Sequence, residues 1–117
     1  ENVKFLGRKS GHELAQWVAS SAGLVYVSYF EGFGLPVLEG MMAGVPVITS
    51  HVTSIPEVGG DAVIYVAPFD EESIVKGMKT AINEGENFVK LGVKQSRKFS
   101  WDKATDELNH IFTNQIS

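Results

Sequence analysis

The sequence lacks cysteine, long apolar runs and any excess of basic residues. The absence of cysteine excludes disulfide bonds, thiolate metal ligands and a cysteine nucleophile, and it fits a cytoplasmic protein. No run approaches the roughly 18 apolar residues of a membrane-spanning helix, and residues 1–5 lack the pattern of a signal peptide. Ten lysines and arginines stand against 14 acidic residues, for a formal charge of -4, and the lysines are scattered singly. We therefore expect a soluble chain that does not bind nucleic acid.

The composition is that of a folded protein. Of the 117 residues, 44% are hydrophobic, which is sufficient for one globular domain with a core. No internal repeat or low-complexity linker divides the chain, so we expect residues 1–117 to form a single domain. A phosphate-bearing small ligand remains compatible with the acidic charge, because backbone dipoles bind anions without a net positive charge.

Apolar runs predict four strands, at residues 3–6, 24–27, 45–48 and 62–66. Apolar residues occupy almost every position of these runs instead of alternating, which indicates a parallel sheet covered on both faces. Helical patterns separate the strands, so the expected fold is α/β, a doubly wound parallel sheet with flanking helices and right-handed crossovers. Pro46 cannot donate a ladder hydrogen bond and should lie near the start of its strand.

A local signal predicts the first helix. Ser10 and Glu13 have the spacing of a capping box, in which each side chain binds a free amide near the other residue. Residues 51–61, in contrast, are too rich in Ser, Thr, Pro and Gly for regular structure. The expected buried face of the first helix consists of Leu14, Trp17 and Val18.

The last third of the chain is predicted to be helical. Asp70 should cap one helix, which Gly85 closes, and a further helix is expected over residues 87–98. Ser100 should cap a final helix that begins at Trp101, a residue expected in the core together with the tryptophan of the first helix. Without a partner domain, part of the apolar face of this final helix is expected to be exposed.

Residues 28–44 follow a predicted strand and form an exposed loop that ends in a helix. In parallel sheets, ligands bind beyond the carboxyl ends of the strands, where these loops lie. The loops to search are therefore residues 7–10, 28–35 and 50–56.

The helix in this segment begins without a side-chain cap. Pro36 suits the first helical position, and Leu35 before it has no capping group. Gly32 and Gly34 allow the backbone to approach a ligand closely. Free amides at the positive end of a helix dipole predict an anion site suited to a diphosphate. The amides expected to lack an intrahelical partner are those of Leu35, Val37 and Leu38.

Two glutamates and a phenylalanine bracket this helix start. Glu39, on the helix flank, would either bind a vicinal diol such as a ribose or bond the free first-turn amides. Glu31, in the loop, is expected to be an unpaired carboxylate that would bind sugar hydroxyls or stabilise positive charge on a sugar ring; the alternative is a solvated loop glutamate. Phe33 would either form the pocket floor or fill the core.

The segment from Glu31 to Glu39 reads E-G-F-G-L-P-V-L-E. It resembles the E-x7-E signature of retaining GT-B glycosyltransferases, specifically the large group 1 (GT4) family. Residues 41–48, M-M-A-G-V-P-V-I, continue the resemblance. Further segments that match the family in order are V-x-F-L-G at 3–7, S-I-P-E-V at 54–58, G-D-A at 60–62 and F-S-W at 99–101.

The resemblance implies a Rossmann-like parallel sheet, part of the C-terminal domain of a GT-B fold. It implies a hexosyltransferase that transfers a sugar from a UDP-, GDP- or ADP-linked donor to an acceptor with retention of configuration, without a required metal ion or other cofactor. Glu31 would be catalytic and contact the donor sugar, and Glu39 would hold the ribose. The other implied donor-binding positions are Gly32, Phe33 and Gly34 along the sugar, Leu35, Pro36 and Val37 at the diphosphate, and Arg8 near the nucleobase.

The chain departs from the family in two single positions and in extent. Val27 stands where many members have proline, and Gly40 where many have alanine; neither is an implied ligand contact. Nothing here matches the N-terminal GT-B domain or the first strand, helix and strand of the donor domain. The resemblance therefore implies a fragment that is inactive alone, whose missing domain is a partner and a route to peripheral membrane contact.

Two other functions are compatible with the residues. One is a non-catalytic nucleotide-binding or protein-interaction module on the same type of sheet. The other is a nucleotide-sugar epimerase or phosphorylase of the same fold. A turnover assay separates the first from a glycosyltransferase, and product analysis separates the second.

Overall fold

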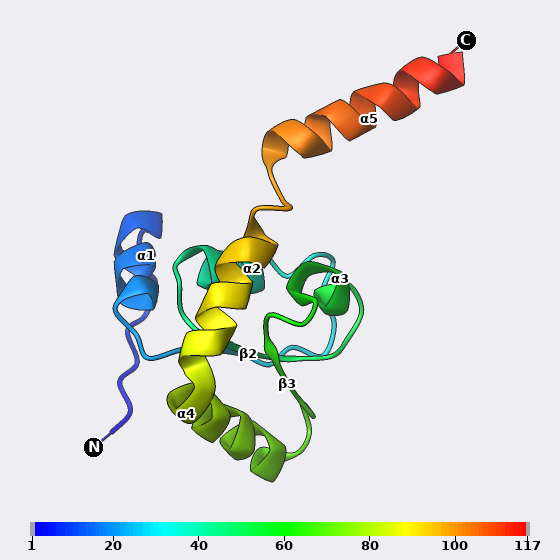
Figure 1. Cartoon of the computed structure of the whole chain (residues 1–117). Helices are drawn as coiled ribbons and strands as arrows, with labels where there is room; N and C mark the ends of the chain where they lie inside the picture. The colour runs from blue at the N-terminus through cyan, green and yellow to red at the C-terminus, as the bar shows by residue number, and fades with distance from the viewer. Residues whose placement is uncertain (1, 117) are drawn as a thin grey trace.

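The computed structural model describes residues 2–116 and has an α/β fold built on a parallel sheet (Figure 1). The strand order is β1-β2-β3, so β2 is central, and Ile48 pairs with Val25 on one side and with Ile64 on the other. The predicted fold class is thus confirmed. In chain order the elements are α1 (Gly11–Ala19), β1 (Leu24–Tyr26), α2 (Leu35–Met42), β2 (Val47–Ser50), α3 (Ile55–Gly59), β3 (Ile64–Val66), α4 (Glu71–Ser96) and α5 (Trp101–Ile116).

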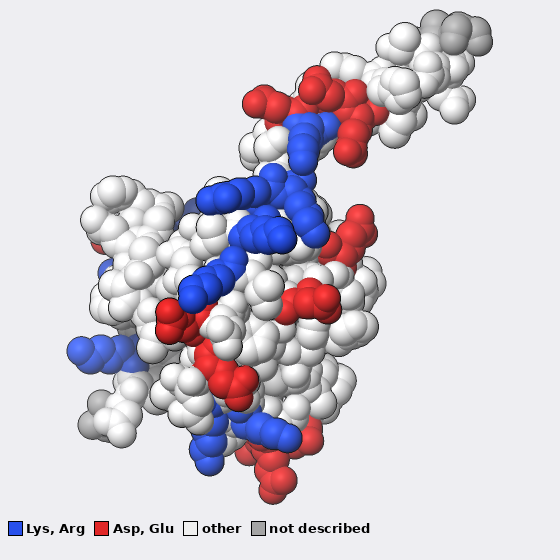
Figure 2. Space-filling model, viewed as in Figure 1, with Lys and Arg blue, Asp and Glu red and all other residues white. Residues whose placement is uncertain are grey.

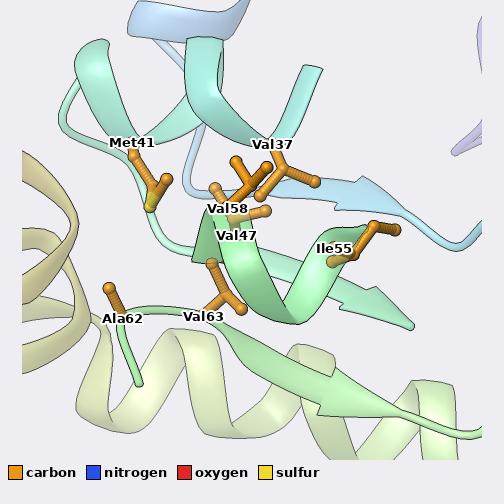
Figure 3. Packing of buried hydrophobic residues seen from close by; sticks show 7 residues of the cluster. All are labelled: Val37, Met41, Val47, Ile55, Val58, Ala62 and Val63. Carbon is orange, nitrogen blue, oxygen red and sulfur yellow. The ribbon is translucent and has the colours of Figure 1, made fainter. Parts of the chain in front are cut away.

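Helices cover both faces of the sheet. On one face α2 and α3 bury a cluster of aliphatic side chains against β2 (Figure 3). On the other face the first half of α4 packs on β2 and β3. Because β2 is buried at every position, its ends are held rigidly and can position the loops that follow. The first cluster contains Val37, Met41, Val47, Ile55, Val58, Ala62 and Val63, and the second contains Ile48, Ile64, Val66 and Ala81.

The first predicted strand is absent from the described residues. Residues 3–6 form no strand, and the Phe5 side chain is 97% exposed. A strand needs a neighbour for its backbone hydrogen bonds, and β1 pairs only with β2 among the described strands. Val25 of β1 is half-exposed, so the expectation that every strand is covered on both faces holds for β2 but not for β1.

The capping signals are confirmed, but two of the helices they start do not reach the core. Ser10 and Glu13 form the predicted capping box, yet α1 has no buried residue among those described. The prediction that Trp17 and Trp101 are core residues is wrong, since they are 50% and 82% exposed. Figure 1 shows α5 projecting away from the sheet, and the molecule measures 61 × 29 × 25 Å.

Two further element predictions are corrected. The segment 51–61 is not irregular throughout, because α3 forms within it with Pro56 in its first turn, a position that suits proline. Gly85 does not end a helix. It lies inside α4, which has 26 residues in all. A Cβ atom at Gly85 would lie 2.7 Å from Cγ of Pro46, so this glycine provides room for the chain entering β2. None of the helices described is long and apolar enough to cross a membrane.

A candidate ligand-binding site at the carboxyl edge of the sheet

Loops that follow the three parallel strands meet at one edge of the sheet. The loop after β1 is bound to the loop after β2, because the Glu31 amide donates to Oγ1 of Thr53 at 3.0 Å. It also reaches the loop after β3, where the rings of Tyr29 and Phe69 stack with centroids 4.5 Å apart. The expected meeting of residues 28–35 with 50–56 is confirmed. Residues 7–10 follow no strand among those described and take no part in these contacts.

The start of α2 is set by one glycine in a left-handed conformation. Gly34 has φ 93° and ψ 47°, a region that L side chains rarely adopt, and a Cβ atom there would meet Cγ1 of Ile55 at 3.4 Å. No side chain caps the helix, as predicted. The left-handed turn instead directs the Gly34 carbonyl at the helix, where it accepts from the amides of Val37 at 3.0 Å and Leu38 at 3.4 Å. The prediction that these two amides are free is therefore wrong.

The unpaired amides lie earlier in the chain than predicted. Within the described part of the chain, the backbone N–H groups of Gly32, Phe33, Gly34 and Leu35 have no hydrogen-bond acceptor. Only the last of them was among the amides expected to be free. Four successive N–H groups before an uncapped helix form a local region of positive potential. Such a region can bind an anionic group without any basic side chain.

The Glu31 carboxylate is held by two side chains, so the expectation that it is unpaired is wrong. Its Oε1 accepts from the Tyr26 hydroxyl and from Oγ of Ser28, the latter at 2.8 Å. These bonds, first that from Tyr26 and then that from Ser28, lower the pKa of Glu31 below its ordinary value because they stabilise the charged form. Its Oε2 has no partner among the described residues. The loop thus presents a fixed negative charge with one oxygen available.

The other predicted site residues differ in their exposure and in their contacts with this edge of the sheet. Glu39 is exposed on α2 and does not bond the first-turn amides in the described structure, so that alternative for it is not observed. Phe33 is 40% exposed and meets Phe99 edge to face at 5.8 Å, so it is not a core residue. Arg8 is exposed, and no hydrogen bond or ion pair found within residues 2–116 joins it to the loop.

Sequence reasoning missed the residues that shape the loop. Thr53 Oγ1 both accepts from the Glu31 amide and donates to the Glu31 carbonyl, at 3.0 and 2.9 Å. Ser54 stands before α3 but does not cap it, and its hydroxyl donates to the same carbonyl at 3.1 Å. Tyr26 was visible only as part of an apolar strand, and Ser28 only as the first residue of the loop after it. The polar pair at 53–54, after a strand and before Pro56, was the one available signal.

Basic side chains gather elsewhere on the surface. Although lysines stand singly in the sequence, helical periodicity places Lys90, Lys94 and Lys98 on one side of α4 and just beyond its end. Figure 2 shows a row of basic atoms along this half of α4 and the start of α5, with acidic side chains beside it. Lys90 is paired with Glu86 at 3.4 Å. The positive potential expected at the loop after β1 therefore comes from its backbone amides.

This combination of parallel sheet, glycine loop and uncapped helix defines a Rossmann-like domain. Residues 1–99 match the family model described as "Glycosyl transferases group 1". The chain belongs to the group 1 glycosyltransferase family, as the motifs at residues 31–39 predict.

Two relatives agree with this assignment, and a solved structure agrees with the fold. The chain is 37% identical over 108 residues to O-antigen chain mannosyltransferase B of Escherichia coli, covering 90% of this chain and 28% of that protein. It is 36% identical over 95 residues to the O-antigen chain mannosyltransferase RfbU of Salmonella typhimurium, covering 76% of this chain and 27% of the relative. Its fold is similar to part of sucrose-phosphate synthase from Thermosynechococcus elongatus, with a TM-score of 0.85 at 22% identity, over 97% of this chain and 30% of that one. The chain spans less than a third of the length of each.

Proposed function

We propose that this chain is the donor-binding part of a retaining glycosyltransferase that uses a nucleotide sugar. The row of unpaired amides between Glu31 and Glu39, in a chain of this family, is the observation that carries the proposal. The reaction breaks the bond between the anomeric carbon and a phosphate oxygen and forms a bond from that carbon to an acceptor hydroxyl oxygen. The acceptor proton is released, and the nucleoside diphosphate leaves with the bonding electrons.

In this proposal each part of the edge binds one part of the donor. The amides of residues 32–35 face the diphosphate and the sugar, where their dipoles stabilise the negative charge that grows on the leaving group. Glu39 accepts hydrogen bonds from the ribose hydroxyls, since its exposed carboxylate has two oxygens with no partner in the described structure. Glu31 contacts the sugar through Oε2 and stabilises positive charge on the ring. Arg8 contacts the nucleobase. This contact requires movement of the N-terminal segment.

Binding of the donor should depend on Glu39. We expect Glu39→Ala to weaken binding of the preferred nucleotide sugar by the intact protein about a hundredfold, because two hydrogen bonds to a charged group are lost. Isothermal calorimetry measures this after a thermal-shift screen of UDP-, GDP- and ADP-linked sugars, mannose donors included because the two relatives above are named mannosyltransferases. Glu84→Ala, at an exposed glutamate of α4, is the control and should bind like wild type. Absence of binding by wild type to the whole panel would refute the donor site.

Sugar transfer should not require a metal ion. Because the proposal assigns stabilisation of the leaving diphosphate to backbone amides, we expect activity after treatment with EDTA to stay within about twofold of the untreated rate. The rate is measured as release of nucleoside diphosphate in the presence of acceptor. A loss that Mg²⁺ or Mn²⁺ restores would contradict this part of the proposal.

A further inference from the structure

Glu31 is held at its side chain by two residues at the end of β1. The Tyr26 hydroxyl and Oγ of Ser28 both approach Oε1, and Oε2 is left without a partner in the described structure. Two donors on one oxygen fix the rotation of the carboxylate as well as its position. A glutamate side chain ordinarily loses considerable rotamer freedom when it is immobilised, and here that loss occurs on folding and before any ligand binds.

Glu31 is also held at its backbone by the loop after β2. Thr53 has φ 46°, and it is the one described residue other than glycine with a positive φ. For a β-branched residue this conformation is strained, and strained backbone is retained where the surroundings impose it. Its Oγ1 bonds both the amide and the carbonyl of Glu31, so this one side chain fixes the peptide groups on either side of Glu31 Cα.

Both contacts are anchored in the buried central strand. Oγ1 of Thr49 donates to the Tyr26 carbonyl at 2.7 Å, and Oγ of Ser50 donates to the Ser28 carbonyl. Both hydroxyl residues are fully buried in β2, whose last residues lead directly to Thr53. The support of Glu31 is thus continuous with the core, and it does not depend on the exposed tip of the loop.

We infer that Tyr26 and Thr53 are positioning residues for Glu31: the tyrosine orients the carboxylate so that Oε2 faces the sugar, and the threonine fixes the backbone. This inference rests on the proposed function of Glu31. A charge fixed before the reaction needs no reorganisation in the transition state, which is the condition under which such a charge accelerates a reaction most. Loss of either contact should therefore lower kcat more than it changes KM.

The tyrosine is tested by Tyr26→Phe in the intact protein. We expect kcat to fall roughly ten- to a hundredfold, the effect of losing one hydrogen bond to a charged group, with KM for the donor within about threefold. Because the hydroxyl lowers the pKa of Glu31, its removal raises that pKa. The acid limb of the kcat profile, where Glu31 becomes protonated, should move to higher pH. Tyr65→Phe is the matched control, since that hydroxyl bonds only the Gly60 carbonyl.

The threonine is tested by a pair of variants. Thr53→Val keeps the β-branched shape and removes the hydroxyl, whereas Thr53→Ser keeps the hydroxyl. We expect the valine variant to lose about tenfold in kcat and the serine variant to stay within about threefold of wild type. A purely structural role of the hydroxyl would instead lower the melting temperature of Thr53→Val in step with its activity and would raise KM as well.

The outcomes separate this inference from the proposed function. If wild type transfers sugar while Tyr26→Phe matches Tyr65→Phe in kcat and in pH profile, the positioning role is wrong and the proposed function stands. If wild type transfers no sugar, the proposed function fails. In that case a ¹³C-detected titration of the Glu31 carboxyl still tests whether Tyr26 binds it. If the pKa of Glu31 is the same in wild type and in Tyr26→Phe, the contact between the two side chains is wrong.

Discussion

Glutamine in place of Glu31 should lower kcat of the intact protein roughly 100- to 1,000-fold, the usual effect of removing one preorganised charge-stabilising group. Glutamine has the size of glutamate, and its amide oxygen can still accept from Tyr26 and Ser28. The loop should therefore keep its conformation while the negative charge beside the sugar is lost. The measurement is the steady-state rate with saturating donor and acceptor.

Binding separates loss of charge from loss of structure in this variant. The Glu31→Gln protein should bind the free nucleoside diphosphate within about threefold of wild type, because the amides that face the phosphates belong to the backbone. Glu107→Gln, at an exposed position of α5, should leave both rate and binding unchanged. If Glu31→Gln turns over at the wild-type rate, the negative charge has no part in catalysis and the role proposed for this glutamate is wrong.

The sequence located the candidate site but did not predict its contacts. Strand, glycine loop and helix follow one another within residues 24–42, so local patterns were sufficient to place Glu31 and Glu39 beside the helix start. The free amides were misassigned because the direction of the Gly34 carbonyl depends on its φ of 93°, which no pattern encodes. The contact between Tyr26 and Glu31 was missed because it depends on how the chain turns after β1.

The errors in the fold have the same cause: local signals were read correctly, and contacts between residues distant in sequence were not. Capping by Ser10 and Asp70 involves residues two or three apart, and both were correctly predicted. The burial of Trp17 and the pairing of residues 3–6 require partners distant in sequence, and residues 2–116 supply none. Gly85 was taken as a helix end because glycine disfavours helices, whereas in the fold it avoids a clash with Pro46.

Three glycines of α4 allow close packing of the helix, and they differ in how near the neighbouring atoms lie. A Cβ atom at Gly77 would lie 2.5 Å from Cγ1 of Val66, one at Gly85 is excluded by proline, and one at Gly92 would lie 3.2 Å from Cγ of Met41. They lie along the side of α4 that packs on the sheet and then on α2. The helix can approach both layers closely because these positions lack side chains, and this packing covers the face of β2 opposite α2.

Gly77→Leu should reduce the free energy of unfolding by about 3 kcal/mol, the upper part of the range for overpacking a core. Valine and isoleucine are stiff at χ1, so Val66 and Ile48, whose Cγ2 would lie 3.0 Å from the new Cβ, cannot move aside as a long flexible side chain would. The loss should occur although leucine favours a helix by up to about 1 kcal/mol over glycine. Urea unfolding followed by far-UV circular dichroism measures it.

The neighbouring residue provides the matched control, because Lys76 is exposed on the same helix and lysine and leucine have similar helix propensities. Lys76→Leu should change stability by less than about 0.5 kcal/mol. The free energy of unfolding of Gly92→Ala should fall between those of the two variants, since the thioether side chain of Met41 can adjust where a valine cannot. If Gly77→Leu is as stable as Lys76→Leu, α4 does not lie on β2 and β3 at the described distance. In that case the burial of β2, on which the positions of Thr49 and Ser50 depend, would need to be revised together with the support inferred for Glu31.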